Sequence, residues 1–357
     1  KISNQDAKGA KDGELVEAEQ IGPRKRLGLA SARIIEVLGD PMAPRSISLI
    51  AIHQHEIPDH FPDEVILAAE KAKPVELGER TDLRHLPLFT IDPSDARDHD
   101  DAICALPDDD TNNPGGHIVW VAIADVAYYV QPGSSLDIEA RKRGNSSYFP
   151  DRVVPMLPDA LSGNLCSLHE GVDRACMAVQ IKLNSKGVKL DHQFYRGIMC
   201  SPASLSYEQA QLAFDGKYDD ATKPLATALK DLFSAYKSAE KARDQRQPLN
   251  LDLPERKIVL SDEGKVLSVD FKNRLDAHKL VEEFMVTANV CAAETLEAVN
   301  ESLLYRVHEE PTLEKLNALR EVVEESGFQL AKGQVLKTQH LNKLLAAAEN
   351  SEDTEIL

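Results

Sequence analysis

Residues 90–102 read TIDPSDARDHDDA and place five aspartates within ten residues of sequence. They are Asp92, Asp95, Asp98, Asp100 and Asp101. Carboxylates packed together without a basic partner for each repel one another, and this repulsion raises the pKa of some of them. Divalent cations remove the repulsion. Mg²⁺ prefers oxygen ligands and keeps several waters, so a few carboxylates and a substrate phosphate complete its octahedron, and two such ions can activate water and stabilise a leaving oxygen.

Two other interpretations of this aspartate cluster remain open. The first is a solvated acidic turn, which the apolar flanks Leu86–Ile91 and Ala102–Ala105 disfavour because they suggest a loop pinned between buried segments. The second is an EF-hand in a calcium-stabilised structural protein. The glycine at the sixth loop position and the glutamate at the twelfth are both missing, so the EF-hand is the weaker alternative.

Composition bounds the remaining possibilities. The chain has 357 residues, of which 42% are hydrophobic, and its formal net charge is -18. It is long enough for two or three domains. The acidic balance opposes non-specific attraction to nucleic acid, so a nucleic acid would have to meet local basic or aromatic patches. We expect no membrane span and no secretory signal, and the odd number of cysteines without a C-x-x-C pair favours small core residues and a cytoplasmic location.

The first part of the chain resembles a small β module. Residues 1–12 form a polar lead-in, and residues 13–73 are predicted to form a small barrel with short strands at Glu14–Val16, Arg33–Val37 and Ser46–His53. Its last part, Pro62–Lys73, has helical spacing. Residues 74–85 are a polar linker.

The second part, residues 86–357, is predicted to be one larger domain. His117–Val130 is β-branched and aromatic enough for one buried strand, and Cys176–Leu183 with Lys189–Ile198 predicts a hairpin. Helical spacing follows at residues 225–246, 276–300, 312–326 and 338–349. Strands followed by helices in blocks indicate an α+β fold.

Five segments, in this order, resemble the RNase II / RNase R family of exoribonucleases and its RNB catalytic domain, and their wording is closer to the RNase R branch. They are LPLFTIDPSDARDHDDAI (86–103), VWVAIADVAYYV (119–130), RGNSSYFPDRVVPMLPDALSGNLCSL (143–168), NRLDAHKLVEEFMVTANVCAA (273–293) and YRVHEEP (305–311). Residues 13–73, with IIEVLGD at 34–40, resemble the second cold-shock (OB-type) barrel of that family.

The resemblance implies a role for four of the five aspartates. Asp92, Asp98, Asp100 and Asp101 fall on the family's catalytic, metal-binding positions, with Asp92 and Asp101 as direct magnesium ligands and Asp100 closest to the chemical step. Asp95 is outside the set and is expected to be structural. The implied cofactor is Mg²⁺, with Mn²⁺ as the alternative.

The resemblance also implies four RNA-binding residues. Tyr148 matches the tyrosine that stacks on the 3′-terminal base, although a core tyrosine beside Phe149 is the simpler interpretation without the family. Tyr207 and Glu282 match positions that contact the sugar-phosphate chain and favour RNA over DNA, whereas Glu282 alone would suit an ordinary amphipathic helix. Leu251 replaces a clamping phenylalanine, so a stacking contact is lost there.

Three basic residues next to Tyr148 in sequence are further candidates for RNA contact. Arg141, Lys142 and Arg143 could bind phosphates, and the alternative is the ordinary basic end of an exposed helix.

The resulting expectation is a monomeric, metal-dependent 3′-to-5′ exoribonuclease that binds single-stranded RNA and releases nucleoside 5′-monophosphates in RNA decay and quality control. The family's later arginine-bearing segment and C-terminal barrel do not occur in the sequence, so we expect a fragment that is weak or inactive alone. A non-catalytic RNA-binding module is the alternative from another class.

Overall fold

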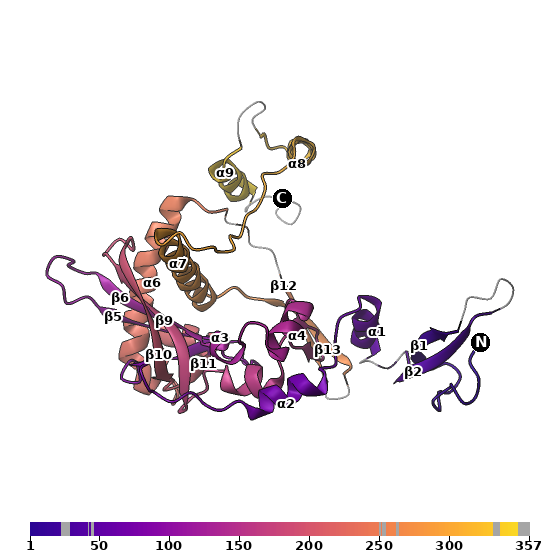
Figure 1. Ribbon diagram of the computed structural model, residues 1–357. Helices are drawn as coiled ribbons and strands as arrows, with labels where there is room; N and C mark the ends of the chain where they lie inside the picture. Colours follow the sequence, from indigo (N-terminus) through magenta and orange to yellow (C-terminus); the bar gives the residue numbers. More distant parts are fainter. Residues whose placement is uncertain are drawn as a thin grey trace. The chain divides into compact units, whose positions relative to one another are not determined.

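The computed structural model describes residues 1–22, 29–41, 43, 46–249, 251, 255–261, 264–330 and 336–348. The chain divides into two compact units, and each unit is assembled from separate stretches of sequence. Unit 1 comprises residues 1–73, 126–165 and 254–273, and unit 2 comprises residues 74–125, 166–253 and 274–357. Helices and strands contribute to both (Figure 1), which confirms the α+β prediction. Within the described ranges, no helix is both long and apolar enough to span a bilayer.

Unit 2 is built on a five-stranded sheet with the order β3-β10-β9-β6-β5. All neighbours pair antiparallel except β3, which runs parallel to β10. The strands are β3 (Thr81–Asp82), β5 (Asp101–Pro107), β6 (His117–Ala124), β9 (Asp173–Leu183) and β10 (Lys189–Cys200). The predicted hairpin is therefore confirmed as β9 and β10. A second, parallel pair joins β4 (Thr90–Asp92) to β11 (Ser204–Ser206).

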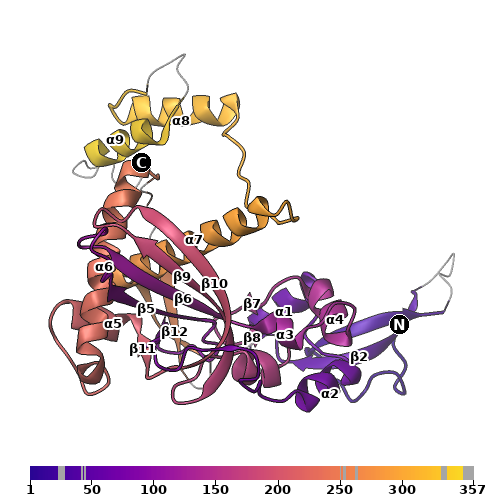
Figure 2. The same cartoon turned by 60° about the vertical axis from the view of Figure 1, so that its left-hand side comes forward.

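Helices bury the apolar side chains of this sheet. Figure 2 shows α6 and α7 beside the strands of unit 2, and both helices contact the sheet and each other. Phe89, Ile103, Val121 and Ile181 from the strands form one core cluster with Phe284 and other helical side chains. The helices of unit 2 are α5 (Tyr207–Phe214), η2 (Lys223–Leu225), α6 (Ala226–Arg246), α7 (Asp276–Ala298), α8 (Leu313–Glu325) and α9 (Thr338–Ala348). The four helices predicted from spacing are thereby confirmed, with ends shifted by one or two residues where the chain is described.

The predicted single strand at His117–Val130 is wrong in its second half. Strand β6 ends at Ala124, and α3 (Val126–Tyr129) follows at once. The reason is Asp125, whose buried carboxylate forms ion pairs with the guanidinium groups of Arg80 at 2.7 Å and Arg196 at 3.2 Å. A buried carboxylate held by two guanidinium groups fixes the chain where the strand turns away.

Unit 1 contains an antiparallel pair, β1 (Leu15–Ile21) with β2 (Ser31–Gly39), as the sequence predicted. The third expected strand, Ser46–His53, is wrong, because these residues form helix α1 (Ser46–Gln54). Its buried residues are Ser46, Ser48 and Ile52, a spacing that by itself does not separate a helix from an alternating strand. Of the expected barrel, the described residues show this strand pair and α1.

The other elements of unit 1 are short. The predicted helix near Pro62–Lys73 is confirmed as α2, which packs against α4. The remaining elements of unit 1 are α2 (Asp63–Lys71), α3 (Val126–Tyr129), α4 (Ser135–Arg143), β7 (Ser147–Tyr148), β8 (Val153–Val154), η1 (Leu161–Leu165), β12 (Glu255–Leu260) and β13 (Val266–Lys272). Strand β7 pairs with β8, and β12 pairs with β13.

The two ion pairs of the buried Asp125 carboxylate lead to a prediction about the stability of the fold. Asp125→Ala leaves two cationic groups without their shared partner, so the free energy of unfolding should fall by about 3–5 kcal/mol. The matched control is Asp82→Ala, which removes the exposed pair with Arg84 and should change the free energy of unfolding much less than Asp125→Ala does. Urea denaturation measures both. Equal losses in the two variants would show that the Asp125 cluster is not a structural anchor.

Candidate functional site

The aspartate cluster lies in a loop between two buried strands. Asp92 ends β4 and Asp101 begins β5, so residues 93–100 form the loop between them. Phe89 and Ile103 pair across its base through two backbone hydrogen bonds of 3.3 and 3.0 Å. This antiparallel closure brings the two ends of the loop together, and the predicted loop pinned between buried segments is therefore confirmed. Strands rather than helices flank it, which excludes an EF-hand.

Polar contacts from a neighbouring segment also hold the loop. The backbone N–H of His99 donates to Ser167 Oγ at 3.0 Å, and Ser167 Oγ donates to the carbonyl of Arg97 at 3.2 Å. The N–H of Leu168 donates to the His99 carbonyl at 2.8 Å. Because Ser167 is fully buried, these bonds tie the loop to the interior. A freely solvated acidic turn does not fit this arrangement.

Two of the aspartates bear the charge repulsion that the sequence predicted. Desolvation together with the charges of Asp98 and Asp92 raises the pKa of Asp100 to about 6. Burial together with the charges of Asp92 and Asp100 raises the pKa of Asp101 to about 7. The carboxylates are thus close enough to disfavour one another's ionised form.

Asp95 does not belong to this group. It is exposed, and no hydrogen bond or ion pair of its side chain is found among the described residues. Its expected structural role therefore gains no support.

His99 is a site residue that the sequence interpretation missed. Its Nδ1 lies 2.7 Å from Asp92 Oδ2, and both side chains are mostly buried. The imidazole thus fixes the orientation of the Asp92 carboxylate, in the way that partners of metal-binding carboxylates commonly do. The signal was present in the sequence as a histidine set between Asp98 and Asp100, inside an otherwise acidic run.

Tyr207 lies beside the aspartates because of strand pairing and a helix cap. Ser206 is the β11 partner of Asp92 and also the N-cap of α5, where it forms a capping box with Gln209. Tyr207 follows as the first helical residue. Burial, then the charges of Asp101 and Asp92, raises the pKa of its phenol to about 12. The phenol is protonated at neutral pH and can donate a hydrogen bond.

A histidine orients the Tyr207 ring. The rings of Tyr207 and His278 stack at 3.9 Å with planes 12° apart. His278 Nδ1 accepts a hydrogen bond from the N–H of Leu275 at the start of α7, so the imidazole is itself held in place. Stacking between two fixed rings limits the positions open to the phenol.

Donor chemistry decides whether the loop suits a divalent cation. The donors are carboxylate oxygens, and a hard cation would relieve the repulsion that raises the pKa of Asp100 and Asp101. In the described part of the chain, however, no three of these aspartates bring ligand atoms within 4.8 Å of one another. Mg²⁺ usually binds through one or two carboxylates and keeps its other positions for water and substrate phosphates. The loop therefore fits Mg²⁺ with few direct protein ligands and does not fit a closed protein cage.

Three of the four expected RNA-binding side chains, Tyr148, Leu251 and Glu282, are accessible, whereas Tyr207 is partly buried. Tyr148, at the end of β7, is 66% exposed, so the alternative of a core tyrosine is wrong. Leu251 is 44% exposed. On α7, Glu282 is exposed and paired with Arg274 at 2.6 Å, whereas the adjacent Glu283 is buried against Arg246 and Arg243. The structure thus separates an accessible glutamate from a structural one.

Arg143 is not a phosphate contact. Its guanidinium is buried, donates to Glu139 at 2.9 Å, to the Pro155 carbonyl at 3.1 Å and to the His60 carbonyl at 2.6 Å, and covers the Phe61 ring at 3.6 Å. Its donors are used in fastening α4, so this prediction is wrong. Arg141 and Lys142 are exposed on the same helix.

The raised pKa of Asp101 sets a pH dependence of stability in metal-free protein. The unfolded carboxyl ionises near 3.8 and the folded one near 7, so the folded state is favoured most at low pH and loses stability as the pH rises from about 4 to about 7. Asp101→Asn should remove part of this loss and raise the unfolding free energy at pH 8 by about 1–3 kcal/mol. Urea melts in EDTA at pH 5 and pH 8 measure the effect, with Asp95→Asn as the control. An unchanged pH slope in Asp101→Asn would contradict the electrostatic assignment.

Comparison with known proteins places the chain in a family. The RNB domain model matches residues 80–357, and a cold shock domain model matches residues 1–62. Ribonuclease R of Escherichia coli is 39% identical over 355 residues, which cover 98% of this chain and 43% of that relative. Ribonuclease R of Aquifex aeolicus is 31% identical and is covered to 51%. The chain therefore spans about half the length of the curated relatives it matches.

Solved structures agree with this match. RNase R of Mycoplasma genitalium, in complexes with ribose-methylated single-stranded RNA and with double-stranded RNA, superposes with a TM-score of 0.89 at 26% identity, over 99% of this chain and 56% or 64% of that one. Yeast Ssd1, described as a pseudonuclease, shares the fold alone, with a TM-score of 0.67 at 17% identity over 99% of this chain and 44% of that one. Since the RNB model covers more than half of the sequence and the curated relatives are ribonuclease R, the chain belongs to the RNB domain family, in its ribonuclease R branch, with a cold-shock domain at its beginning.

Proposed function

We propose that the chain carries the metal-binding and substrate-binding part of a 3′-to-5′ exoribonuclease that acts on single-stranded RNA in RNA decay. One observation carries the proposal: a loop held between buried strands gathers carboxylates whose burial and mutual repulsion raise the pKa of Asp100 and Asp101, and it lies beside a protonated phenol. Such a loop binds divalent cations and, through them, phosphates. The ribonuclease R relatives and the RNA complexes of the Mycoplasma enzyme support RNA as the ligand.

The proposed reaction is hydrolysis of the last phosphodiester. Water attacks the phosphorus, the bond to the 3′ oxygen of the preceding nucleotide breaks, and that oxygen leaves with a proton. A nucleoside 5′-monophosphate and a shortened RNA result. Divalent cations held at the aspartates, Mg²⁺ by the donor chemistry above, supply charge stabilisation and an activated water when they are bound.

Each side chain of the loop then has a defined task. Asp92, oriented by His99, and Asp101 hold cations in place, with Asp98 completing the negative site. Asp100 accepts a hydrogen bond from the attacking water and orients it, because its carboxylate is the more solvent-accessible of the two with raised pKa values. Tyr207 donates its O–H to a phosphate oxygen. Preorganised donors and charges of this kind lower the barrier because they need no rearrangement during reaction.

Recognition of RNA is proposed to use accessible side chains. Tyr148 offers an exposed ring for the terminal base, and stacking suits a sequence-indifferent enzyme because each base has a π-face. Glu282 can accept a hydrogen bond from a ribose 2′-OH, which DNA lacks, while its partner Arg274 can contact phosphate. Leu251 contributes apolar contact without stacking.

We also propose a cytoplasmic location and a monomeric state. All five cysteines are free, and burial raises the pKa of Cys104, Cys166 and Cys176 to about 12, so these thiols are unreactive core residues. Free cysteines suit a reducing compartment.

The alternative is a catalytically inactive RNA-binding module. The likeness to Ssd1, described as a pseudonuclease, is the observation that favours it, because the fold by itself does not establish hydrolysis. The distinguishing assay uses a 5′-labelled single-stranded RNA and the matching DNA, with and without Mg²⁺, on this chain and on a version extended to the length of its relatives. A metal-dependent RNA ladder with intact DNA supports the exoribonuclease. RNA retention without cleavage by either version would establish the binding module instead.

Asp100 tests the chemical step. In a version of the chain that cleaves RNA, Asp100→Asn should lower the single-turnover rate by at least about a hundredfold. RNA affinity should be nearly unchanged, because the lost charge is used in the transition state. Asp95→Asn is the matched control and should keep the rate. Wild-type turnover in Asp100→Asn would remove this residue from the mechanism.

Tyr148 tests the end of the reaction. Loss of a stacked base costs about 1–3 kcal/mol of binding, and this loss matters most for short RNA with few other contacts. Tyr148→Ala should therefore leave longer final products while changing the initial rate on long RNA much less. Denaturing gels of the end products measure the effect, with the exposed Tyr218→Ala as the control. An unchanged final length would show that Tyr148 does not hold the terminal base.

A further inference from the structure

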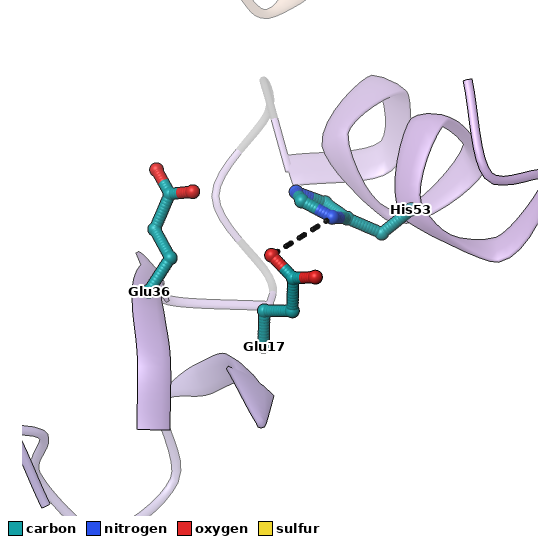
Figure 3. Close-up of side chains that lie close together, drawn as sticks. All are labelled: Glu17, Glu36 and His53. Atoms are coloured by element: carbon teal, nitrogen blue, oxygen red, sulfur yellow. Dashed lines mark ion pairs between the residues drawn. The ribbon is translucent and has the colours of Figure 1, made fainter. Parts of the chain in front are cut away.

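A second group of metal-ligating side chains lies in unit 1, away from the aspartate loop in sequence. Glu17 on β1, Glu36 on β2 and His53 on α1 bring their ligand atoms within 4.8 Å of one another. Figure 3 shows the imidazole directed from the helix toward the two carboxylates. Among the described residues, this is the group with metal-ligand spacing.

The pairing of the strands forces the two glutamates together. Glu17 and Glu36 are direct partners in the β1-β2 register. Like charges directly opposite each other in an antiparallel pair repel and destabilise the sheet. In the described part of the chain, the imidazole of His53 faces this pair, and its Nδ1 lies 3.6 Å from Glu17 Oε2.

Among the described residues, no hydrogen bond to the His53 ring is found. The 3.6 Å contact of Nδ1 is too long for one, and Nε2 is buried without a partner among the described residues. Buried polar atoms are normally satisfied, and an unsatisfied one is costly. A single ion binds one ring nitrogen, so the atoms that an ion would complete are the facing carboxylates and the Nδ1 beside them.

Helix α1 holds His53 in this position. Its neighbour Ile52 is 1% exposed, and Ser48 donates a hydrogen bond to Asp151 within the same unit. Ser46 at the start of the helix donates to the carbonyl of Asp40, one residue beyond the end of β2. The three metal-ligating side chains thus lie on β1, β2 and α1, which are held by contacts within the same unit. Ion binding therefore needs little ordering of the chain.

We propose that Glu17, Glu36 and His53 form a binding site for a divalent transition-metal ion, with zinc as the ion that fits the donor set. One imidazole nitrogen and two carboxylates match the ligands of zinc, at about 2.0–2.2 Å each, with a remaining position for water. Two such ligands stand about 3.4 Å apart around a tetrahedral ion. The pair His53–Glu17 is already near this separation at 3.6 Å, and the Glu36 oxygen lies within 4.8 Å of both.

The same donors distinguish this site from the aspartate loop. Imidazole favours zinc, copper and nickel over magnesium, whereas an all-carboxylate site suits magnesium. The ion would tie α1 to both strands and cancel the repulsion of the glutamate pair. Its role is to stabilise this module, and it does not depend on the proposed nuclease function.

Calorimetric titration of the whole chain with ZnCl₂ in millimolar Mg²⁺ tests the site, because Mg²⁺ occupies the oxygen-only loop. We expect zinc binding that is at least tenfold weaker in His53→Gln and in Glu36→Gln. Zinc should also raise the melting temperature of the wild-type chain and have less effect on both variants. The matched control is His55→Gln, which removes an exposed histidine next to the same helix and should bind zinc as the wild type does.

Folding and binding are separated by the metal-free variants. Glu36→Gln relieves the like-charge pair, so without zinc its melting temperature should equal or exceed that of the wild type. A folded Glu36→Gln chain that has lost zinc binding supports the site. Zinc binding that is unchanged in both His53→Gln and Glu36→Gln, or that is absent from the wild type, would overturn the proposal.

Discussion

The pairing of Phe89 with Ile103 is the constraint on which the site depends. Both side chains are fully buried in the core of unit 2, and their backbone bonds close the base of the acidic loop. Hydrophobic burial at the two ends thereby holds carboxylates at separations that they would not adopt in an unfolded chain. The raised pKa values of Asp100 and Asp101 reflect this cost. A site that stores charge repulsion in this way is suited to bind cations.

The two acidic groups of the chain differ in what can relieve their repulsion. The aspartate loop presents oxygen atoms that do not gather at ligand spacing, so water and phosphate can complete the coordination of a magnesium ion. The Glu17, Glu36 and His53 group includes a nitrogen donor and is more compact. Reactivity requires open coordination positions, whereas a structural ion is held by protein ligands on several sides. The geometry therefore suggests a reactive metal site at the aspartate loop and a structural metal site in the cold-shock module.

A shared fold does not decide whether this family member is active. The fold is shared over 99% of this chain with Ssd1, a protein described as a pseudonuclease. Activity must therefore come from particular side chains. The side chains proposed for this activity are the aspartates, Tyr207 and the residues that orient them. His99 and His278 are the orienting residues, since His99 contacts Asp92 and His278 stacks on Tyr207. Such orienting partners determine how well a site performs.

The sequence by itself determined the α+β class, the family and the position of the acidic loop between buried segments, because spacing and local motif are carried by consecutive residues. It also placed α2, the β9-β10 hairpin and the later helices, whose periodicity is strong. Only the tertiary structure decided that Ser46–His53 is a helix, that β6 stops before Asp125 and that Arg143 is buried. In these cases, partners distant in sequence set the outcome. His99 and the cross-strand glutamates Glu17 and Glu36 could not be recognised from the sequence either. Their roles come from contacts that a local sequence pattern does not show.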